Sequence, residues 1–115
     1  MKIIFLDIDG VLATDNQFYM NRHNFHKNHP EARELRIPYP FDKKCVKVFN
    51  DILDATGAEI VLSSDWREHF SLGELDSIFK FNGVNKSPID VTSTKVASFG
   101  NITMNRAYQI GLYIT

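Results

Sequence analysis

Cysteine, long apolar runs and charge of one sign are all scarce in this sequence. Its one cysteine, Cys45, permits neither an intramolecular disulfide nor a zinc site built from several cysteines, which fits a reducing compartment. No apolar run reaches the roughly 18 residues of a membrane span, and the segment before Asp7 is too short for a signal peptide. These absences predict a cytoplasmic protein without a membrane segment.

Charge and length restrict the function classes further. The net charge is -1, so the molecule lacks the overall positive field of a dedicated duplex-binding protein. Its 115 residues, 43% hydrophobic and 23% charged, predict a single compact domain over 1–115. Basic residues nevertheless outnumber acidic ones by six to three within residues 20–44. These six are Arg22, Lys27, Arg33, Arg36, Lys43 and Lys44.

The apolar pattern predicts an α/β protein with a parallel sheet. Residues 3–6 form a continuous apolar run that is typical of a buried strand, and residues 58–62 form a second one. Between them, apolar residues spaced by three and four predict a helix within 41–56, which Gly57 would end. A strand, a helix and a strand in this order form a right-handed parallel crossover.

The other segments are less regular. Residues 71–81 predict a helix capped by Ser71, and residues 104–114 predict an amphipathic helix. Residues 84–103 are expected to be mostly loop. Residues 13–40, called the insertion below, have little apolar periodicity and are expected to be irregular.

Paired acids follow the first predicted strand. Asp7 and Asp9 stand at its carboxyl end, where open α/β sheets generally bind ligands. Like charges this close repel, and a divalent cation is the usual means of keeping both ionised. The pair therefore predicts a ligand site, the alternative being a polar strand end with a plain turn at Asp9-Gly10.

Ser63 and Ser64 follow the second predicted strand, which places hydroxyl groups beside the paired acids. A hydroxyl there, with neighbouring backbone N–H groups, could hold a phosphate oxygen. Serine also commonly caps a short helix. We expect one of the two serines to act only as a cap.

Two segments resemble motifs of the haloacid dehalogenase-like (HAD) phosphohydrolase superfamily. FLDIDGVL at residues 5–12 fits its hhhhDxDGxL signature, and EIVLSSDWR at residues 59–67 looks like its second motif. Similar SSxWR sequences occur in small members, some of them associated with nucleic-acid repair. The resemblance implies a Rossmann-like three-layer sandwich with a parallel sheet, in which residues 13–40 form a flap or minimal cap.

The resemblance also implies roles for individual residues. Asp7 would attack phosphorus to form an aspartyl-phosphate, and Asp9 would protonate the leaving oxygen and later activate water. Mg²⁺ would be held by the Asp7 carboxylate and the Asp9 backbone carbonyl. Ser63 would bind a phosphoryl oxygen.

The third and fourth motifs of the superfamily are matched less well. The third is a cation that pairs with the nucleophile and the phosphate; Arg106 fits its place, and Lys95 competes with it. The fourth is an apolar strand ending in acidic residues, and no such strand precedes Thr115. We therefore expect a truncated or inactive member that could self-associate through the exposed edge of strand 2–6.

The histidines and a tryptophan allow other interpretations. His23, His26 and His29 have a spacing that a metal site can use, but no neighbouring ligand completes the set. A polar loop, or a basic lid that receives an anionic substrate, is the preferred interpretation of this region. Trp66 could stack on a base or a substrate ring, or could pack in the core.

The leading hypothesis from the sequence is a Mg²⁺-dependent phosphatase that acts on a small phosphomonoester. One alternative is a phosphatase of nucleic-acid ends, supported by the basic residues 20–44 and the SSDWR segment. The other is a catalytically incomplete HAD-like interaction module, motivated by the missing fourth motif.

Overall fold

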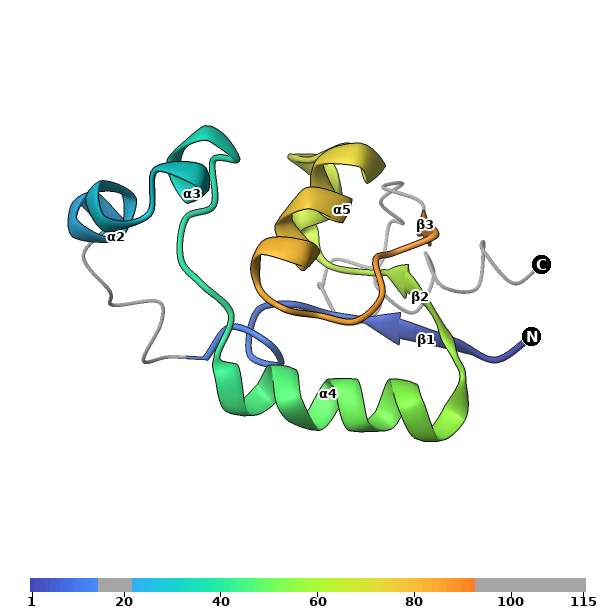
Figure 1. Cartoon of the computed structure of the whole chain (residues 1–115). Coiled ribbons are helices and arrows are strands. Elements are labelled where there is room, and N and C mark those ends of the chain that lie inside the picture. Colours follow the sequence, from blue (N-terminus) through green and yellow to red (C-terminus); the bar gives the residue numbers. More distant parts are fainter. Residues whose placement is uncertain (15–21, 93–115) are drawn as a thin grey trace.

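The computed structural model describes residues 1–14 and 22–92 of the chain (Figure 1). Within them, three parallel strands form a sheet in the order β1-β2-β3. The strands are β1 (Ile3–Leu6), β2 (Glu59–Leu62) and β3 (Asp90–Val91). The predicted α/β fold with a parallel sheet is confirmed. None of the helices in these two ranges is long and apolar enough to span a membrane.

The register of the sheet aligns the residues that follow the strands. Leu6 lies opposite Leu62, and Leu62 lies opposite Val91. Pairing continues for one more residue, because the N–H of Ser63 donates to Leu6 O at 2.8 Å and that of Thr92 to Leu62 O at 2.9 Å. One row at the carboxyl edge of the sheet therefore contains Asp7, Ser63 and Thr92.

Helix α4 (Lys43–Thr56) connects β1 to β2 and matches the predicted amphipathic helix. It begins after Asp42, whose side chain accepts from the N–H of Lys44 at 2.8 Å, and it ends at Gly57 with a φ of 64°. A capping carboxylate and a left-handed glycine satisfy the orphan backbone groups at the two ends. The buried face of the helix consists of Val46, Phe49 and Leu53.

The connection from β2 to β3 contains the short 3₁₀ helix η1 (Asp65–Glu68) and helix α5 (Leu72–Phe81). A capping box starts α5, because Ser71 Oγ accepts from Glu74 N at 3.2 Å and Glu74 Oε1 accepts from Ser71 N at 3.0 Å. The predicted helix over 71–81 is thus confirmed. Residues 84–103 were expected to be mostly loop, but β3 begins at Asp90. A strand of two residues is too short to show an alternation of apolar and polar residues in the sequence.

Helix α4 contacts the segment that follows α5. The Asn50 amide on α4 donates to Gly83 O at 3.0 Å, and its oxygen accepts from Asn85 N at 2.9 Å, just beyond the end of α5. Two successive right-handed crossovers place their helices on one face of a sheet, which is consistent with this contact. The rings of Phe41, just before α4, and Phe79 on α5 pack edge to face at 5.5 Å in the core.

The insertion contains two helices, so the prediction of irregular structure was wrong. They are α2 (Arg22–Asn28) and α3 (Pro30–Glu34), which lie at the left of Figure 1, away from the strands. Each buries one residue, Phe25 in α2 and Ala32 in α3, and so leaves no periodic apolar pattern. Pro30 at the first turn of α3 is a start signal that the periodicity did not reveal.

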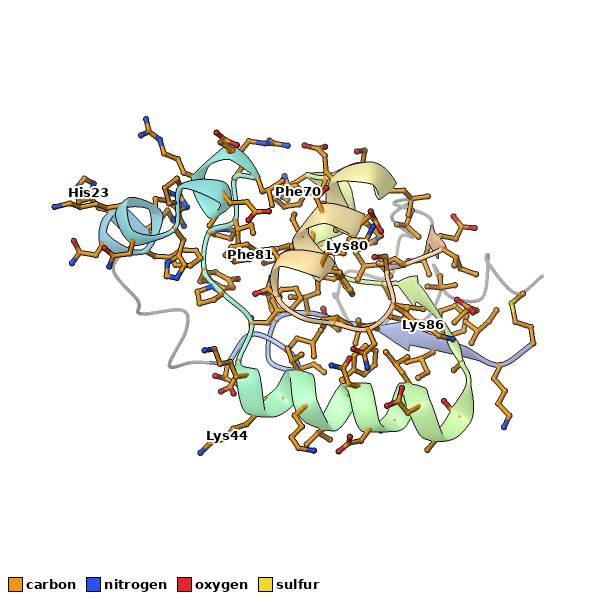
Figure 2. The ribbon with its side chains drawn as sticks, in the orientation of Figure 1. His23, Lys44, Phe70, Lys80, Phe81 and Lys86 are labelled. Carbon is orange, nitrogen blue, oxygen red and sulfur yellow. The ribbon has the colours of Figure 1, made fainter. Side chains whose placement is uncertain are left out.

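Polar contacts attach the insertion to the rest of the domain. Arg36 Nη2 donates to Glu74 Oε2 at 2.6 Å, and its guanidinium lies 5.1 Å from the ring centre of Phe70, which Figure 2 labels. Glu74 thus uses one oxygen for the capping box of α5 and the other for the insertion. Both side chains of the Arg36–Glu74 pair are substantially exposed, so the pair contributes little to stability.

Three sequence predictions fall on residues outside the described ranges. These are the helix over 104–114 and the two candidate phosphate-pairing cations, Arg106 and Lys95. The exposed edge at strand 2–6 also stays a prediction; within the described ranges, β1 pairs with β2 alone.

Candidate functional site

The loop after β1 places Asp7 and Asp9 on either side of a fully buried residue, Ile8. The carbonyl oxygen of Ile8 accepts from three backbone N–H groups, at 2.9 to 3.1 Å, donated by Val11, Leu12 and Ala13. Gly10 has a φ of 84°, a conformation that permits this tight reversal and that residues with a Cβ rarely adopt. The two carboxylates are therefore carried by a loop with a closely defined main chain.

Asp9 is oriented by two aromatic side chains from distant parts of the sequence. Tyr39 OH donates to Asp9 Oδ1 at 2.7 Å, and Trp66 Nε1 donates to the same oxygen at 3.1 Å. The two rings also contact each other edge to face at 5.8 Å. Because both donors bind Oδ1, they fix the rotation of the carboxyl group.

The Tyr39 phenol is a donor to Asp9 at neutral pH. Burial, with a further contribution from the hydrogen bond to Asp9, raises the pKa of Tyr39 well above its ordinary value. Ionisation of the phenol would place a second negative charge against the carboxylate. Tyr39 therefore stays protonated at neutral pH and holds Asp9 in one orientation.

Asp7 stands next to a buried hydroxyl group in the row at the sheet edge. Its Oδ1 accepts from the N–H of Ile8 at 2.9 Å. The neighbouring Ser63 Oγ is buried and has no hydrogen-bond partner among residues 1–14 and 22–92, and the same holds for Thr92 Oγ1, one strand further. Buried hydroxyls without partners are rare in folded proteins and call for an explanation, such as a ligand. Two unsatisfied donors thus share a row with the Asp7 carboxylate.

The two serines after β2 have different structural roles, as the sequence predicted. Ser64 Oγ accepts from Trp66 N at 3.3 Å and caps η1. Ser63 Oγ takes no part in the cap, and Ser63 lies in the row with Asp7 at the sheet edge.

Comparison with protein families identifies the domain. Residues 3–115 match the family described as the HAD domain in Swiss Army Knife RNA repair proteins. The chain belongs to this family. The matched range contains the HAD signature at Asp7 and Asp9, and membership supports hydrolase or phosphatase activity at this coarse level. No curated protein and no solved structure matches the chain.

The HAD domain offers oxygen ligands for a metal at the sheet edge. Carboxylate and carbonyl oxygens suit Mg²⁺, and Asp7 and Asp9 supply both kinds. Within residues 1–14 and 22–92, no group of three or more His, Cys, Asp or Glu side chains has the geometry to hold an ion. The donor set therefore fits Mg²⁺ in its chemistry and contains few protein ligands.

Two histidines of the insertion hydrogen-bond to backbone carbonyl groups. His26 Nε2 donates to Ile37 O at 2.6 Å, and His29 Nδ1 donates to Phe25 O at 3.2 Å. His23 points away from the body of the molecule (Figure 2). The geometry thus provides no support for a metal site at these three residues.

Trp66 packs in the core of the HAD domain. Its side chain is buried, with the rings of Phe41 and Phe70 at 5.8 and 5.5 Å. The core interpretation is therefore confirmed, and stacking on a substrate is not supported.

Sequence reasoning missed that Tyr39 and Trp66 donate to Asp9, because they are separated from it by 30 and 57 positions. The one available signal was the presence of aromatic donors beside the predicted motifs.

Proposed function

We propose that the chain is a phosphatase that removes the terminal phosphate from RNA ends through an aspartyl-phosphate on Asp7. One observation carries this proposal: the Asp7 carboxylate stands in one row with the unpartnered hydroxyl of Ser63, beside an Asp9 that two donors orient. An anionic phosphoryl group would supply the acceptor that this hydroxyl lacks. The RNA repair context of the family favours an RNA end over a small phosphate ester.

The proposed reaction has two displacements at phosphorus. In the first, an Asp7 carboxylate oxygen bonds to phosphorus, the phosphorus–ester oxygen bond breaks, and Asp9 gives its proton to the departing oxygen. In the second, Asp9 takes a proton from water as the water oxygen bonds to phosphorus. The acyl phosphate bond then breaks, which regenerates Asp7 and releases inorganic phosphate.

Tyr39 and Trp66 are positioning residues in this scheme. They occupy Asp9 Oδ1, so Oδ2 is the oxygen available to carry the transferred proton. A carboxyl group held in one orientation needs less rearrangement to reach a geometry that allows proton transfer. The donors therefore act on the chemistry through Asp9.

Further groups would stabilise negative charge at phosphorus. Bound Mg²⁺, with ligands from the Asp7 carboxylate and the Asp9 backbone carbonyl, would supply electrostatic stabilisation. Arg106 is the first candidate for the cation that pairs with the phosphate, and Lys95 is the second. The basic side chains of the insertion, among them Arg22, Lys27 and Arg33, would attract an anionic strand.

Phosphate release from matched substrates tests the proposal. Single-stranded RNA with a 3′- or 5′-phosphate is compared with an aryl phosphate, each with Mg²⁺ or with a chelator, and Asp7→Asn serves as the control. We expect Mg²⁺-dependent release that is faster from RNA. Faster release from the aryl phosphate would favour a small-ester enzyme, and no release from any substrate would favour the interaction module.

A further inference from the structure

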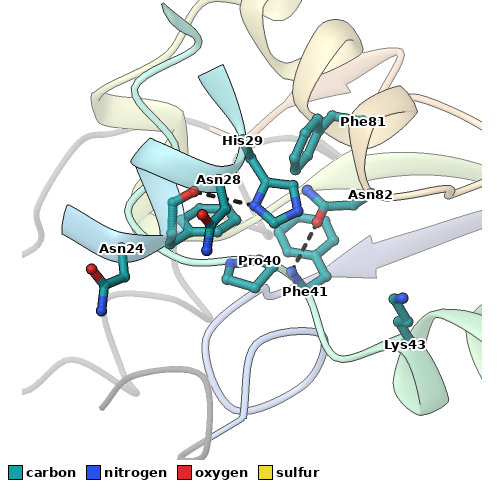
Figure 3. Close-up of a pocket in the computed structure, with 9 residues that line it drawn as sticks. Asn24, Asn28, His29, Pro40, Phe41, Lys43, Phe81 and Asn82 are labelled. Atoms are coloured by element: carbon teal, nitrogen blue, oxygen red, sulfur yellow. Dashed lines mark hydrogen bonds between the residues drawn. The ribbon is translucent and has the colours of Figure 1, made fainter. Parts of the chain in front are cut away.

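A cavity lies between the insertion and the core, apart from the row of Asp7, Ser63 and Thr92. Its volume is about 650 Å³, within the range of small-molecule sites. Helix α2, the segment before α4 and the end of α5 enclose it (Figure 3). Its lining includes the aromatic residues Phe25, Phe41 and Phe81 and the polar residues Asn28, His29 and Lys43.

The aromatic rings give this cavity apolar walls at fixed positions. Phe25 and Phe81 meet edge to face at 6.4 Å, and His29 meets the same two rings at 5.2 and 6.3 Å. Phe41 is buried and anchored on its far side by Phe79. Preformed aromatic walls of this kind suit a flat ring, since every nucleobase has a π face that can stack or meet an edge.

Polar groups with free hydrogen-bonding capacity line the same cavity. His29 Nδ1 donates to Phe25 O, so in the neutral ring Nε2 is an acceptor, and within the described residues it has no partner. The Asn28 amide can both donate and accept, and it also makes no hydrogen bond within the described residues. Donors and acceptors together match the edge of an unpaired base. Lys43 at the start of α4 adds a cation for a backbone phosphate.

The cavity is one aromatic layer away from the carboxylate of Asp9. Phe41 lines the cavity and contacts the Trp66 ring at 5.8 Å, and Trp66 Nε1 donates to Asp9. The main chain makes the same connection, because Tyr39 bonds to Asp9 while the following Pro40 lines the cavity. A ligand that occupied both places would be a phosphate joined to a ring, as in a nucleotide.

We propose that this cavity binds a nucleobase at the end of the RNA strand whose terminal phosphate is held at Asp7. The inference rests on the proposed function and adds a specificity site to it. Single-stranded ends fit this site better than paired ones, because a paired base would hide the edge that Asn28 and His29 are placed to read.

Two variants and a modified substrate test the base site in the full chain. Asn28→Ala removes an exposed amide, and Phe81→Leu removes a ring but retains apolar volume; Asn85→Ala is the matched control, since Asn85 is also exposed and lies outside the cavity. We expect the Kd for single-stranded RNA to rise roughly 5- to 100-fold in Phe81→Leu, the range that loss of one base stack produces, and roughly 2- to 10-fold in Asn28→Ala, the range for loss of one hydrogen bond. The Asn85→Ala control should bind this RNA with the same Kd as wild type.

RNA with an abasic terminal or penultimate nucleotide provides the second arm. It should bind wild type at least as weakly as intact RNA binds either test variant, with no further loss in Asn28→Ala. Equal affinity of wild type and Asn28→Ala for intact RNA would overturn the base site, even if the aryl phosphate is hydrolysed. The opposite outcome is also distinguishable. If the chain has no phosphatase activity but binds RNA without a terminal phosphate, and Asn28→Ala weakens that binding, the base site is upheld and the proposed function is refuted.

Discussion

The indole Nε1 of Trp66 donates a hydrogen bond to Asp9 Oδ1 over 3.1 Å, although 57 positions separate the two residues. The bond connects the loop after β1 with the helix after β2, so the packing of a core aromatic also determines where a proposed general acid points. Trp66 is held in turn by Ser64, which caps its helix. The proposed catalytic carboxyl is therefore supported by the core itself.

Replacing Trp66 by Phe should slow the proposed reaction without unfolding the domain, because an aromatic ring stays in the core while the Nε1 donor and part of the indole volume are lost. Hydrogen bonds to charged groups contribute about 1.5–3 kcal/mol, so kcat should fall roughly 10- to 100-fold. The fall should be greatest for esters with poor leaving groups, which depend most on the acid. A leaving-group series on Trp66→Phe, with Asp9→Asn as reference, measures this. Equal slowing for all leaving groups would contradict the positioning role.

Asp7→Asn should abolish phosphate release, by roughly a thousandfold or more, because the amide cannot form the acyl phosphate. The substitution is nearly isosteric, so the melting temperature should change little. Malachite-green detection of phosphate and a thermal melt measure the two effects. Retained turnover in this variant would exclude Asp7 as the nucleophile.

Ser63→Ala and Ser64→Ala should have opposite effects. Ser63 Oγ has no partner in the part of the chain that the structure describes, so its removal should leave the free energy of unfolding unchanged or raise it, while kcat/KM falls about tenfold or more. Ser64→Ala removes a cap and should lower the free energy of unfolding by about 1 kcal/mol. Chemical denaturation and steady-state kinetics on both variants check this. A strongly destabilised Ser63→Ala would mean that the hydroxyl has a structural partner.

The raised pKa of Tyr39 predicts a loss of stability in alkali. Unfolded tyrosine ionises near pH 10, whereas the folded phenol keeps its proton to a higher pH. The contribution of Tyr39 is therefore complete below about pH 10 and is lost as the pH rises above it. Unfolding curves between pH 8 and 11 should show a shallower decline for Tyr39→Phe than for wild type. Identical slopes would argue against the bond to Asp9 in solution.

The basic residues of the insertion predict that ionic strength weakens binding of an anionic substrate. Arg36 is already paired with Glu74, so Arg22, Lys27 and Arg33 are the better candidates for this attraction. The KM for phosphorylated RNA should rise with salt, and neutralising the three residues should flatten that dependence. A KM that is independent of salt in wild type would exclude steering by the insertion.

The sequence was informative where its signals are local. Runs of apolar residues predicted β1, α4 and β2, and the paired acids and the serine pair identified the sheet edge. Helices α2 and α3 were missed because each buries a single residue, and β3 because two residues carry no alternation. The donors to Asp9 could not be found either, since a contact between positions 9 and 66 exists only after the chain has folded.

The shared use of Glu74 gives the domain an acid response. Its pKa is lowered, first by the N–H of Ser71 and then by Arg36. A carboxyl with a lowered folded pKa stabilises the protein above its unfolded pKa and ceases to do so as the pH falls through the folded value. One protonation event would thus weaken both the first turn of α5 and the attachment of the insertion. Acid below the ordinary pKa of a glutamate side chain should therefore loosen these two regions together.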